Sequence, residues 1–180
     1  MAGDGEVDIN MELKKFEIKA KTLYECVSET FLKAVEEAVK KGVNLKNADF
    51  KKTYLKSAKL EKADLEGADL RSADLSHANL KNANLKNADL KGADLQKACL
   101  ENANLEGANL GNVYLINANL TNANLENANL QRATLEGANL KGANLKGAKL
   151  LFVYLDKGQI KIKKEQINDF LNALGVIVED

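Results

Sequence analysis

The chain has 180 residues, 45% of them hydrophobic, and its 26 Lys and Arg residues equal its 26 Asp and Glu residues. This length predicts one domain, and the apolar share is sufficient for a core. The balanced charge gives no gross sign of a protein that binds nucleic acid or a membrane surface. No apolar run approaches the ~20 residues that a membrane-spanning helix needs.

Cellular location is predicted from two further features. The N-terminus carries Asp4, Glu6 and Asp8 and lacks the basic and apolar regions of a signal peptide. Only two cysteines occur, Cys26 and Cys99, in different segments of the chain. Together these features predict a cytoplasmic protein with two reduced thiols.

Changes of pattern divide the chain into four segments. Residues 1–10 are small and acidic and predict a poorly packed tail. Residues 11–42 are predicted to form an N-terminal cap, residues 43–157 a repeat domain and residues 158–180 a C-terminal cap. Caps are expected because the end coils of a repeat protein expose an open core and unpaired backbone groups.

The N-terminal cap is predicted to contain two short strands and a helix. The strand residues, on either side of a turn near Ala20, are Leu13, Phe16 and Ile18, then Leu23, Tyr24 and Cys26. Ser28 is the expected N-cap of the helix, which presents Leu32, Val35 and Val39 on one face and runs to Lys40. Gly42 then stands where a C′ glycine is expected.

A five-residue repeat dominates the chain from Val43 onward. Every fifth residue from Leu45 to Leu155 is Leu except Phe50, so the unit A-(N/D)-L-x-x occurs 23 times in tandem. A period of five fits neither the 3.6 of a helix nor the 2 of a flat strand, so each unit should form one side of a larger coil.

The number of sides follows from three exceptions to the motif. Thr53, Val113 and Val153 replace the usual Ala, and each is followed by Tyr. The tyrosines Tyr54, Tyr114 and Tyr154 are separated by 60 and 40 residues, which are both multiples of 20. Four units therefore make one coil, and the three tyrosines should stack on the same wall.

These tandem units resemble the pentapeptide-repeat family over about two-thirds of the chain. The resemblance implies an all-β solenoid, a right-handed quadrilateral β-helix, in which the Leu and Ala positions point inward. Some bacterial members enter the first unit from a short helix, as Ala34–Gly42 would here. An idealised engineered array is the other origin considered, but irregularities such as Cys99 favour a natural chain.

The corners of such a coil need residues that tolerate positive φ, as Gly and Asn do. One corner column consists entirely of these two residues: Asn47, Gly67, Asn87, Gly107, Asn127 and Gly147.

The C-terminal cap is predicted to contain a strand and an amphipathic helix. Ile160 and Ile162 alternate with polar residues, and the helix starts near Lys164. Its apolar face comprises Ile167, Phe170, Leu171 and Leu174, and Gly175 should end it. The apolar run that follows predicts a homodimer, whose contact residues would be Phe170, Leu174, Val176, Ile177 and Val178.

The sequence predicts no catalytic, cofactor-binding or metal-binding residues, and therefore no enzyme. The single His77 stands at an outward corner position without neighbouring ligands, and Cys99 has no neighbouring base. The outward aspartates of the repeat are expected to bond to local backbone or to neighbouring coils. They are Asp49, Asp64, Asp69, Asp74, Asp89 and Asp94.

The predicted function is that of a structural or protein-interaction rod whose partner the sequence does not name. The candidate interaction surface is the tyrosine-bearing wall with Tyr54, Tyr114, Tyr154 and the nearby Phe152. Elsewhere, columns of alternating charge, such as Glu61, Lys81 and Glu101 or Glu66, Lys86 and Glu106, are expected to stabilise neighbouring coils.

Two other functions remain open. The family resemblance implies a DNA-mimicking inhibitor or protector of a type II topoisomerase, as in quinolone-resistance members. Residues 41–157 carry 17 Lys and Arg against 13 Asp and Glu, a net charge of +4, which weighs against DNA mimicry. A nucleic-acid-binding rod would use the lysines near one end, Lys46, Lys51, Lys52, Lys56, Lys59 and Lys62. No aromatic stacking platform accompanies them.

Overall fold

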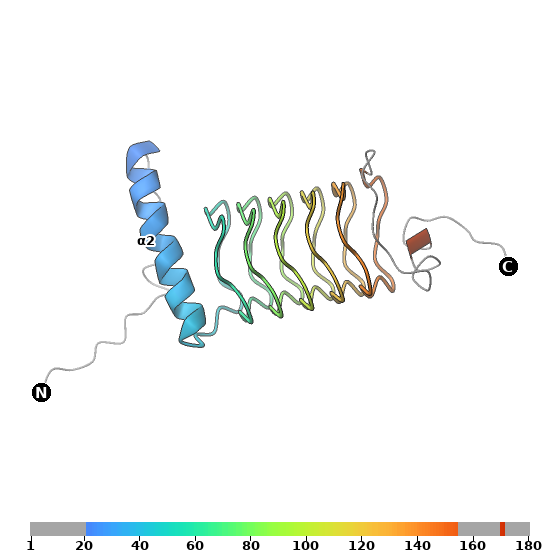
Figure 1. Ribbon diagram of the computed structural model, residues 1–180, viewed down its shortest axis with the longest axis horizontal. Helices are drawn as coiled ribbons and strands as arrows, with labels where there is room; N and C mark the ends of the chain where they lie inside the picture. Colours follow the sequence, from blue (N-terminus) through green and yellow to red (C-terminus); the bar gives the residue numbers. More distant parts are fainter. Residues whose placement is uncertain (1–20, 155–169, 172–180) are drawn as a thin grey trace, which may run out of the picture.

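The computed structural model describes residues 21–154 and 170–171 of the chain. In this part of the chain the helix α2 (Lys21–Lys40) lies across one end of a stack of coils (Figure 1). The coils follow one another in sequence order along a single axis, and residues 170–171 form a short helical segment near the far end. The repeat therefore builds a rod rather than a layered domain.

Parallel β-bridges join residues that are 20 positions apart. The series starts with the pair Asp49 and Asp69 and ends with the pair Thr134 and Tyr154. This spacing confirms that four repeat units make one coil. It also confirms that Tyr54, Tyr114 and Tyr154 belong to one column, whose members are Tyr54, Asp74, Asp94, Tyr114, Thr134 and Tyr154.

One repeat unit, residues 104–108, shows how the backbone is satisfied. The N–H of Asn104 donates to the carbonyl of Ala83 in the preceding coil at 2.9 Å. The N–H groups of Leu105 and Gly107 donate into the following coil at 2.7 and 2.8 Å, and that of Ala108 closes the turn onto Leu105 at 3.0 Å. The N–H of Glu106 donates to Oδ1 of Asn104 at 3.2 Å. All five donors are thus paired, as a buried or half-buried backbone requires.

Every turn between two walls places its third residue at positive φ. The geometry, with a hydrogen bond from the fourth residue to the first, is that of a type II turn, which favours Gly or Asn at this position. Positive φ occurs in all four corner columns, and it includes Lys52 (φ 57°), Arg132 (φ 59°) and Phe152 (φ 58°). The stacking of the coils therefore imposes this conformation on residues that do not favour it.

The alternation of Asn and Gly in one corner column has a steric reason. A Cβ added to Gly107 would lie 2.5 Å from Oδ1 of Asn87, whose side chain extends over the next coil. The same relation holds between Gly67 and Asn47, and between Gly147 and Asn127. In each of these pairs, the glycine accommodates the amide of the preceding coil.

The interior of the rod is filled by the Leu and Ala positions of the motif. Every motif leucine from Leu55 to Leu150 is at most 1% exposed, and the single Val113 is fully buried where an alanine usually stands. Buried side chains from all four walls, together with three residues of α2, form one hydrophobic cluster. The expected inward orientation of both positions is confirmed.

The N-terminal segment differs from its prediction. Leu23, Tyr24 and Cys26 lie within α2 (Lys21–Lys40), so the strand predicted for them is wrong, and Ser28 is an interior helical position rather than the N-cap. The physical reason is that apolar residues recur at helical spacing from Tyr24 through Val27 and Phe31, which extends the amphipathic face backward. The strand predicted at Leu13, Phe16 and Ile18 lies outside the described residues.

The C-terminal end of α2 follows the glycine rule. Gly42 adopts φ 69°, its N–H donates to the carbonyl of Val39, and the N–H of Val43 donates to that of Ala38. This pair of bonds is a Schellman motif. It stops the helix after Lys40 and directs the chain into the first coil.

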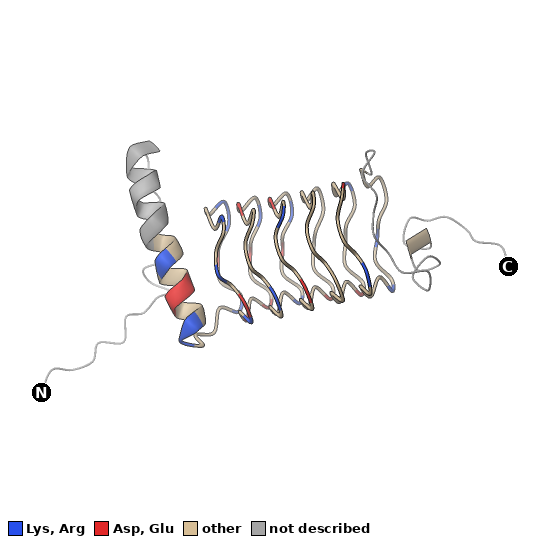
Figure 2. Cartoon of the chain, viewed as in Figure 1, with Lys and Arg blue, Asp and Glu red and all other residues tan. Residues whose placement is uncertain are grey.

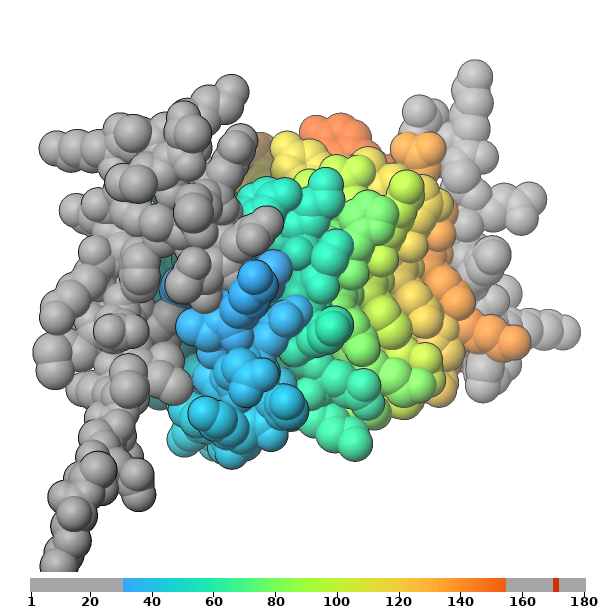
Figure 3. Space-filling view, turned by 60° about the vertical axis from the view of Figure 1, so that its left-hand side comes forward, coloured from blue at the N-terminus to red at the C-terminus, as the bar shows by residue number. Residues whose placement is uncertain are grey.

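The helix α2 packs on the first coil through one face. Phe31, Val35 and Ala38 are buried, and the Phe31 ring meets that of Phe50 edge to face, with centroids 6.3 Å apart. Phe50 is the one aromatic at a Leu position, and it fills the space under the helix. The Glu36 carboxylate accepts the backbone N–H of Lys59 at 2.9 Å, in place of the carbonyl that a preceding coil would supply. Figure 3 shows residues 31–40 of α2 lying against the first coil.

The described segment near the C-terminus packs onto the rod. Phe170 is buried and belongs to the same hydrophobic cluster as the rod interior, while the strand predicted at Ile160 and Ile162 lies outside the described residues. Within residues 21–154 and 170–171, no helix has the length and apolar character needed to cross a membrane.

Candidate functional site

Three of the four walls use their outward central position to stabilise the rod itself. The clearest is the asparagine wall, defined by the column Asp64, Asn84, Asn104, Asn124 and Asn144. Each amide Nδ2 donates to Oδ1 of the residue one coil earlier, at 3.0, 3.3, 3.2 and 3.0 Å along the column. The relay begins at Asp64 because a carboxylate can only accept, whereas Asn both accepts and donates.

The same side chains also complete the turns. The N–H of Glu106 donates to Asn104, that of Glu126 to Asn124 and that of Lys146 to Asn144, at 3.2, 3.2 and 3.1 Å. One Asn such as Asn104 thus satisfies a backbone donor that faces no other coil, and it links its own coil to the preceding and the following coil. This double role explains why Asn or Asp recurs at this position.

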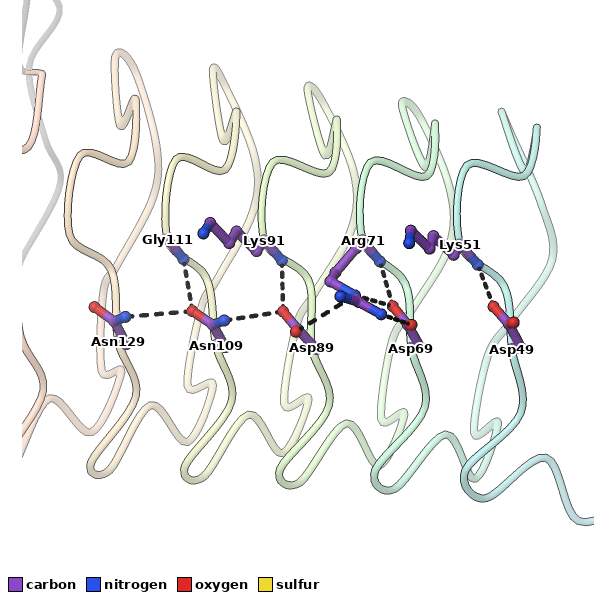
Figure 4. Close-up of polar contacts among 9 residues, drawn as sticks. All are labelled: Asp49, Lys51, Asp69, Arg71, Asp89, Lys91, Asn109, Gly111 and Asn129. Carbon is purple, nitrogen blue, oxygen red and sulfur yellow. Dashed lines mark hydrogen bonds and ion pairs between the residues drawn. The ribbon is translucent and has the colours of Figure 1, made fainter.

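The second wall, the carboxylate wall, is defined by the column Asp49, Asp69, Asp89, Asn109, Asn129 and Lys149. Figure 4 shows this column from Asp49 to Asn129. Three stacked carboxylates repel one another, and Arg71 lies between two of them. Its guanidinium pairs with both oxygens of Asp69 and lies 3.6 Å from Oδ2 of Asp89. Beyond Asp89 the amide relay resumes, with Asn109 donating to Asp89 at 2.9 Å and Asn129 to Asn109 at 3.3 Å.

Arg71 changes the protonation equilibrium of this wall. Its hydrogen bonds hold the pKa of the Asp69 carboxyl below its usual value, against the opposing effect of partial burial. The same contacts raise the pKa of Arg71. Asp69 is therefore ionised, and Arg71 offsets the repulsion between coils. The two groups therefore stabilise the rod.

Ion pairs between coils follow the predicted charge columns. Lys81 and Glu101, and Lys86 and Glu106, lie 3.0 Å apart, which confirms that these stacked charges pair with the following coil. Lys46 of the predicted basic cluster is also paired, with Glu66 at 3.0 Å. Blue and red residues are accordingly interspersed over the coils (Figure 2).

The third wall is defined by the column Lys59, Asn79, Cys99, Asn119 and Asn139. There Nδ2 of Asn139 donates to Oδ1 of Asn119 in the preceding coil at 3.5 Å.

The fourth wall, the tyrosine wall, departs from this design. Its column, Tyr54, Asp74, Asp94, Tyr114, Thr134 and Tyr154, makes no side-chain hydrogen bond from one coil to the next within the described part of the chain. Asp74 and Asp94 still accept the turn N–H groups of Ser76 and Gln96, each at 2.9 Å. The tyrosines have no oxygen at the position where Asp or Asn accepts this N–H. The wall therefore gives up the interaction that the other three walls use.

Exposed aromatic groups occupy the last coils of this wall. Tyr114 is 49% exposed and Tyr154 is 61% exposed, whereas Tyr54, at the opposite end of the column, is 38% exposed. The corner beside Tyr154 carries Leu151 and Phe152, which are 42% and 77% exposed. The structure thus places three of the four predicted surface residues, Tyr114, Tyr154 and Phe152, in one half of the wall and Tyr54 in the other.

Phe152 combines exposure with an unfavourable backbone. It is the bulkiest residue at a positive-φ corner, where most positions hold Asn, Gly or Lys. A left-handed conformation costs an ordinary residue roughly 1–2 kcal/mol. Among the described residues, the exposed Phe152 side chain makes no contact that would stabilise the rod in return for this cost. Backbone strain of this kind is often found at functional sites.

The remaining predicted residues show no chemistry. His77 is an exposed corner residue at φ 60°, and Cys99 is a half-buried free thiol between Asn79 and Asn119 in its column. No group of three or more His, Cys, Asp or Glu side chains in the described ranges is arranged to hold a metal ion. Of the predicted dimer contacts, Phe170 packs with the rod interior. The others, Leu174, Val176, Ile177 and Val178, lie outside the described residues, so that dimer stays a prediction.

Sequence reasoning missed the continuous amide relay and the double role of Arg71. A signal for the first was present, because acceptor-only Asp precedes Asn along the asparagine wall and along the carboxylate wall. The contacts of Arg71 with both Asp69 and Asp89 had no such signal, since Arg71 is one of several basic residues that follow a motif leucine.

Comparison with protein families and solved structures gives a consistent result. A family model described as Pentapeptide repeats (8 copies) matches residues 41–71, 68–107 and 108–147. A pentapeptide repeat protein from the cyanobacterium Cyanothece 51142 is 33% identical over 66% of this chain and 87% of its own, with a TM-score of 0.51. One from the thylakoid lumen of Arabidopsis thaliana is 31% identical over 60% and 73%, with a TM-score of 0.55.

A third solved structure is a pentapeptide repeat protein from Nostoc PCC 7120. It is 42% identical over 53% of this chain and 80% of its own, with a TM-score of 0.50. No curated protein sequence matches the chain significantly.

Proposed function

Because the chain belongs to the pentapeptide-repeat family, we propose that it is a right-handed, four-sided β-helix capped at both ends, which acts as a non-enzymatic rod for binding another protein. The motif Leu and Ala side chains fill its interior. Binding therefore uses the outer surface, and the tyrosine wall is the part of that surface we assign to it. The wide spacing of Cys26 and Cys99 supports a reducing, cytoplasmic location.

One observation carries this proposal: the tyrosine wall gives up a self-stabilising interaction for exposed aromatic rings. Tyr114 stands where Asn104 stands on the asparagine wall, yet the N–H of Ile116, unlike that of Glu106, has no partner within the described residues. A local rule that is broken without gain to the fold marks a functional position. Aromatic side chains are also the residues that most often anchor protein interfaces.

The contact lies in the C-terminal half of the wall. Tyr114, Leu151, Phe152 and Tyr154 are exposed there. In the N-terminal half only Tyr54 is aromatic, and the other two central residues are the carboxylates Asp74 and Asp94, which accept hydrogen bonds from their own turns. An apolar contact surface bordered by charged groups fits a protein partner.

The test uses a substitution that separates binding from folding. A double variant, Tyr114→Asn with Tyr154→Asn, restores the motif residue, so it should fold at least as well as the native chain. Both proteins, immobilised on beads, would be exposed to a lysate of the source cell, and the captured proteins quantified by mass spectrometry. We expect a partner that binds the native chain and is lost with the double variant.

The matched control is Lys141→Asn, an exposed substitution that lies on another wall. It should retain the partner at the native level. A partner retained equally by all three proteins would contradict the assignment of the tyrosine wall.

A further inference from the structure

Two unpaired charges of opposite sign flank the tyrosine wall at its fifth coil. Arg132 and Glu136 lie two residues before and two residues after Thr134. Arg132 is exposed and Thr134 and Glu136 are half-buried, whereas Ala133 and Leu135 between them are fully buried, so the three share the outer side of the wall. Neither Arg132 nor Glu136 has an ion-pair partner within the described residues, unlike Lys81 and Glu101 on another wall. The wall thus carries a positive edge and a negative edge at this level, with a small residue between them.

This arrangement is complementary to itself in one orientation. If two copies pack face to face with a two-fold axis parallel to the rods, each coil meets the same coil of the other copy, and left and right edges exchange. Arg132 of each copy then faces Glu136 of the other. A two-fold axis across the rods makes them antiparallel and places Arg132 on Arg132 and Glu136 on Glu136. Charge complementarity therefore selects the parallel dimer.

The central column favours contact most at the last coils. In the parallel arrangement Tyr114 meets Tyr114 and Tyr154 meets Tyr154, and Thr134 leaves room between the rings. Toward the N-terminus, Asp74 and Asp94 would face their own copies, which like charges disfavour. The edge residues at the coil of Tyr114 are Asn112 and Ile116, so Ile116 of each copy meets Asn112 of the other.

From this geometry we propose that the partner of the tyrosine wall is a second copy of this chain, packed in parallel through coils that carry Tyr114, Thr134 and Tyr154. The proposal rests on the function assigned to this wall and names its occupant. It differs from a dimer through the C-terminal tail, because none of its contact residues follows Tyr154.

The size of the surface predicts a weak dimer. Three aromatic side chains and their neighbours offer less than the roughly 800 Å² per partner of a standard interface. The dissociation constant is therefore expected to be on the order of 10 μM or weaker. Such a dimer forms only at high protein concentration or where copies are held close together.

The first test is sedimentation equilibrium of the full chain from about 5 to 500 μM. We expect the native chain to shift from monomer to dimer over this range. Arg132→Glu should weaken the dimer at least about tenfold, because it places like charges opposite each other twice. The double variant Arg132→Glu with Glu136→Arg should restore it, since the exchanged charges are again complementary.

Each alternative result overturns a defined part of the proposal. Unchanged association of Arg132→Glu would favour the antiparallel arrangement, in which like charges face each other before and after the substitution. A monomer at 500 μM would exclude the dimer. Thermal melting of each variant verifies that it is folded. If the native chain stays monomeric but loses a cellular partner with Tyr114→Asn and Tyr154→Asn, the dimer is wrong and the interaction rod stands. If neither association nor capture depends on these tyrosines, both proposals fail.

Cross-linking gives a second, independent readout. In a chain with Cys26→Ser and Cys99→Ser, Thr134→Cys places one thiol at the centre of the proposed contact. A bismaleimide that spans the roughly 10 Å between packed sheets should link two copies. Asn124→Cys, on the asparagine wall, is the control and should give no linked dimer. Equal linking of both variants would contradict the assigned face.

Discussion

The asparagine wall and the tyrosine wall share one backbone and one core but use their outward central position differently. On the first, Asn104 links three coils and completes a turn, with hydrogen bonds of 3.2 to 3.3 Å. On the second, Tyr114 makes neither contact and is 49% exposed. The comparison teaches that the repeat can keep its shape with one wall freed from self-stabilisation, because the inner leucines and the backbone ladder hold the coils together.

The largest effects should come from the core, where the two walls are alike. Leu105→Ala, beneath the asparagine wall, and Leu95→Ala, beneath the tyrosine wall, remove side chains that are fully buried. Each should lower the free energy of unfolding by ~2–5 kcal/mol through lost burial and the cavity left behind. Urea denaturation of both variants measures this. Costs that differ by more than ~1 kcal/mol would show that the walls are also packed differently inside.

Exchanging the outward central residues Asn104 and Tyr114 measures how much each wall depends on this position for stability. Asn104→Tyr removes a turn bond and two relay bonds, so we expect a loss of ~1–3 kcal/mol. Tyr114→Asn should be neutral or stabilising by up to ~1 kcal/mol, because the new amide can accept the N–H of Ile116 and donate to Asp94.

Chemical denaturation of the pair gives both values. Opposite signs for the two substitutions are the expected outcome. If Tyr114→Asn proves as costly as Asn104→Tyr, the tyrosine rings stabilise the rod. Their exposure would then not indicate a binding surface.

Arg71→Gln on the carboxylate wall should have a smaller effect, which depends on pH. At neutral pH the loss should be small, because the pair lies at the surface, where solvent screens it. The native pKa of Asp69 is lowered, so the stabilisation is fully present above the unfolded value of about 4 and is lost as pH falls through the native pKa.

Thermal melts of the native chain and of Arg71→Gln from pH 7 to pH 2 test this. The two melting temperatures should converge in acid. A difference that stays constant down to pH 2 would mean that Arg71 acts through packing rather than through the Asp69 carboxylate.

The smallest expected effect is on DNA gyrase. None of the walls carries the dense negative charge of a DNA mimic, and the repeat has a net charge of +4 from 17 basic and 13 acidic residues in 41–157. We expect no inhibition at micromolar protein, and no protection from a quinolone, in a supercoiling assay. Clear protection would contradict the exclusion of DNA mimicry from the net charge.

Much of the fold was predictable from the positions of a few residues. The spacing of Tyr54, Tyr114 and Tyr154 gave the 20-residue coil, and the bridge between Thr134 and Tyr154 confirms their shared wall. The prediction failed for Leu23, Tyr24 and Cys26, which belong to α2 rather than to a strand. A short apolar run does not reveal its period, and here the helical face continues to Phe31 on the first coil.

The candidate site was predictable only in part. Tyr114, Tyr154 and Phe152 stood out as exceptions to the motif, and the structure brings them into one half of a wall. The positive φ of Phe152 and the missing partners of Arg132 and Glu136 depend on how turns and coils meet in space. The sequence shows these residues but not their conformation or surroundings.

What the sequence determined by itself is the periodic part of the molecule: which residues face inward, how many units make a coil and which residues share a column. Those properties follow from a repeat in which each residue's role is set by its position in the unit. Only the tertiary structure shows in which columns the outward side chains bond to the next coil and in which they do not. A relay such as Asn124 to Asn104, or a clamp such as Arg71 between Asp69 and Asp89, joins coils 20 residues apart. These contacts form only when the coils stack within hydrogen-bonding distance.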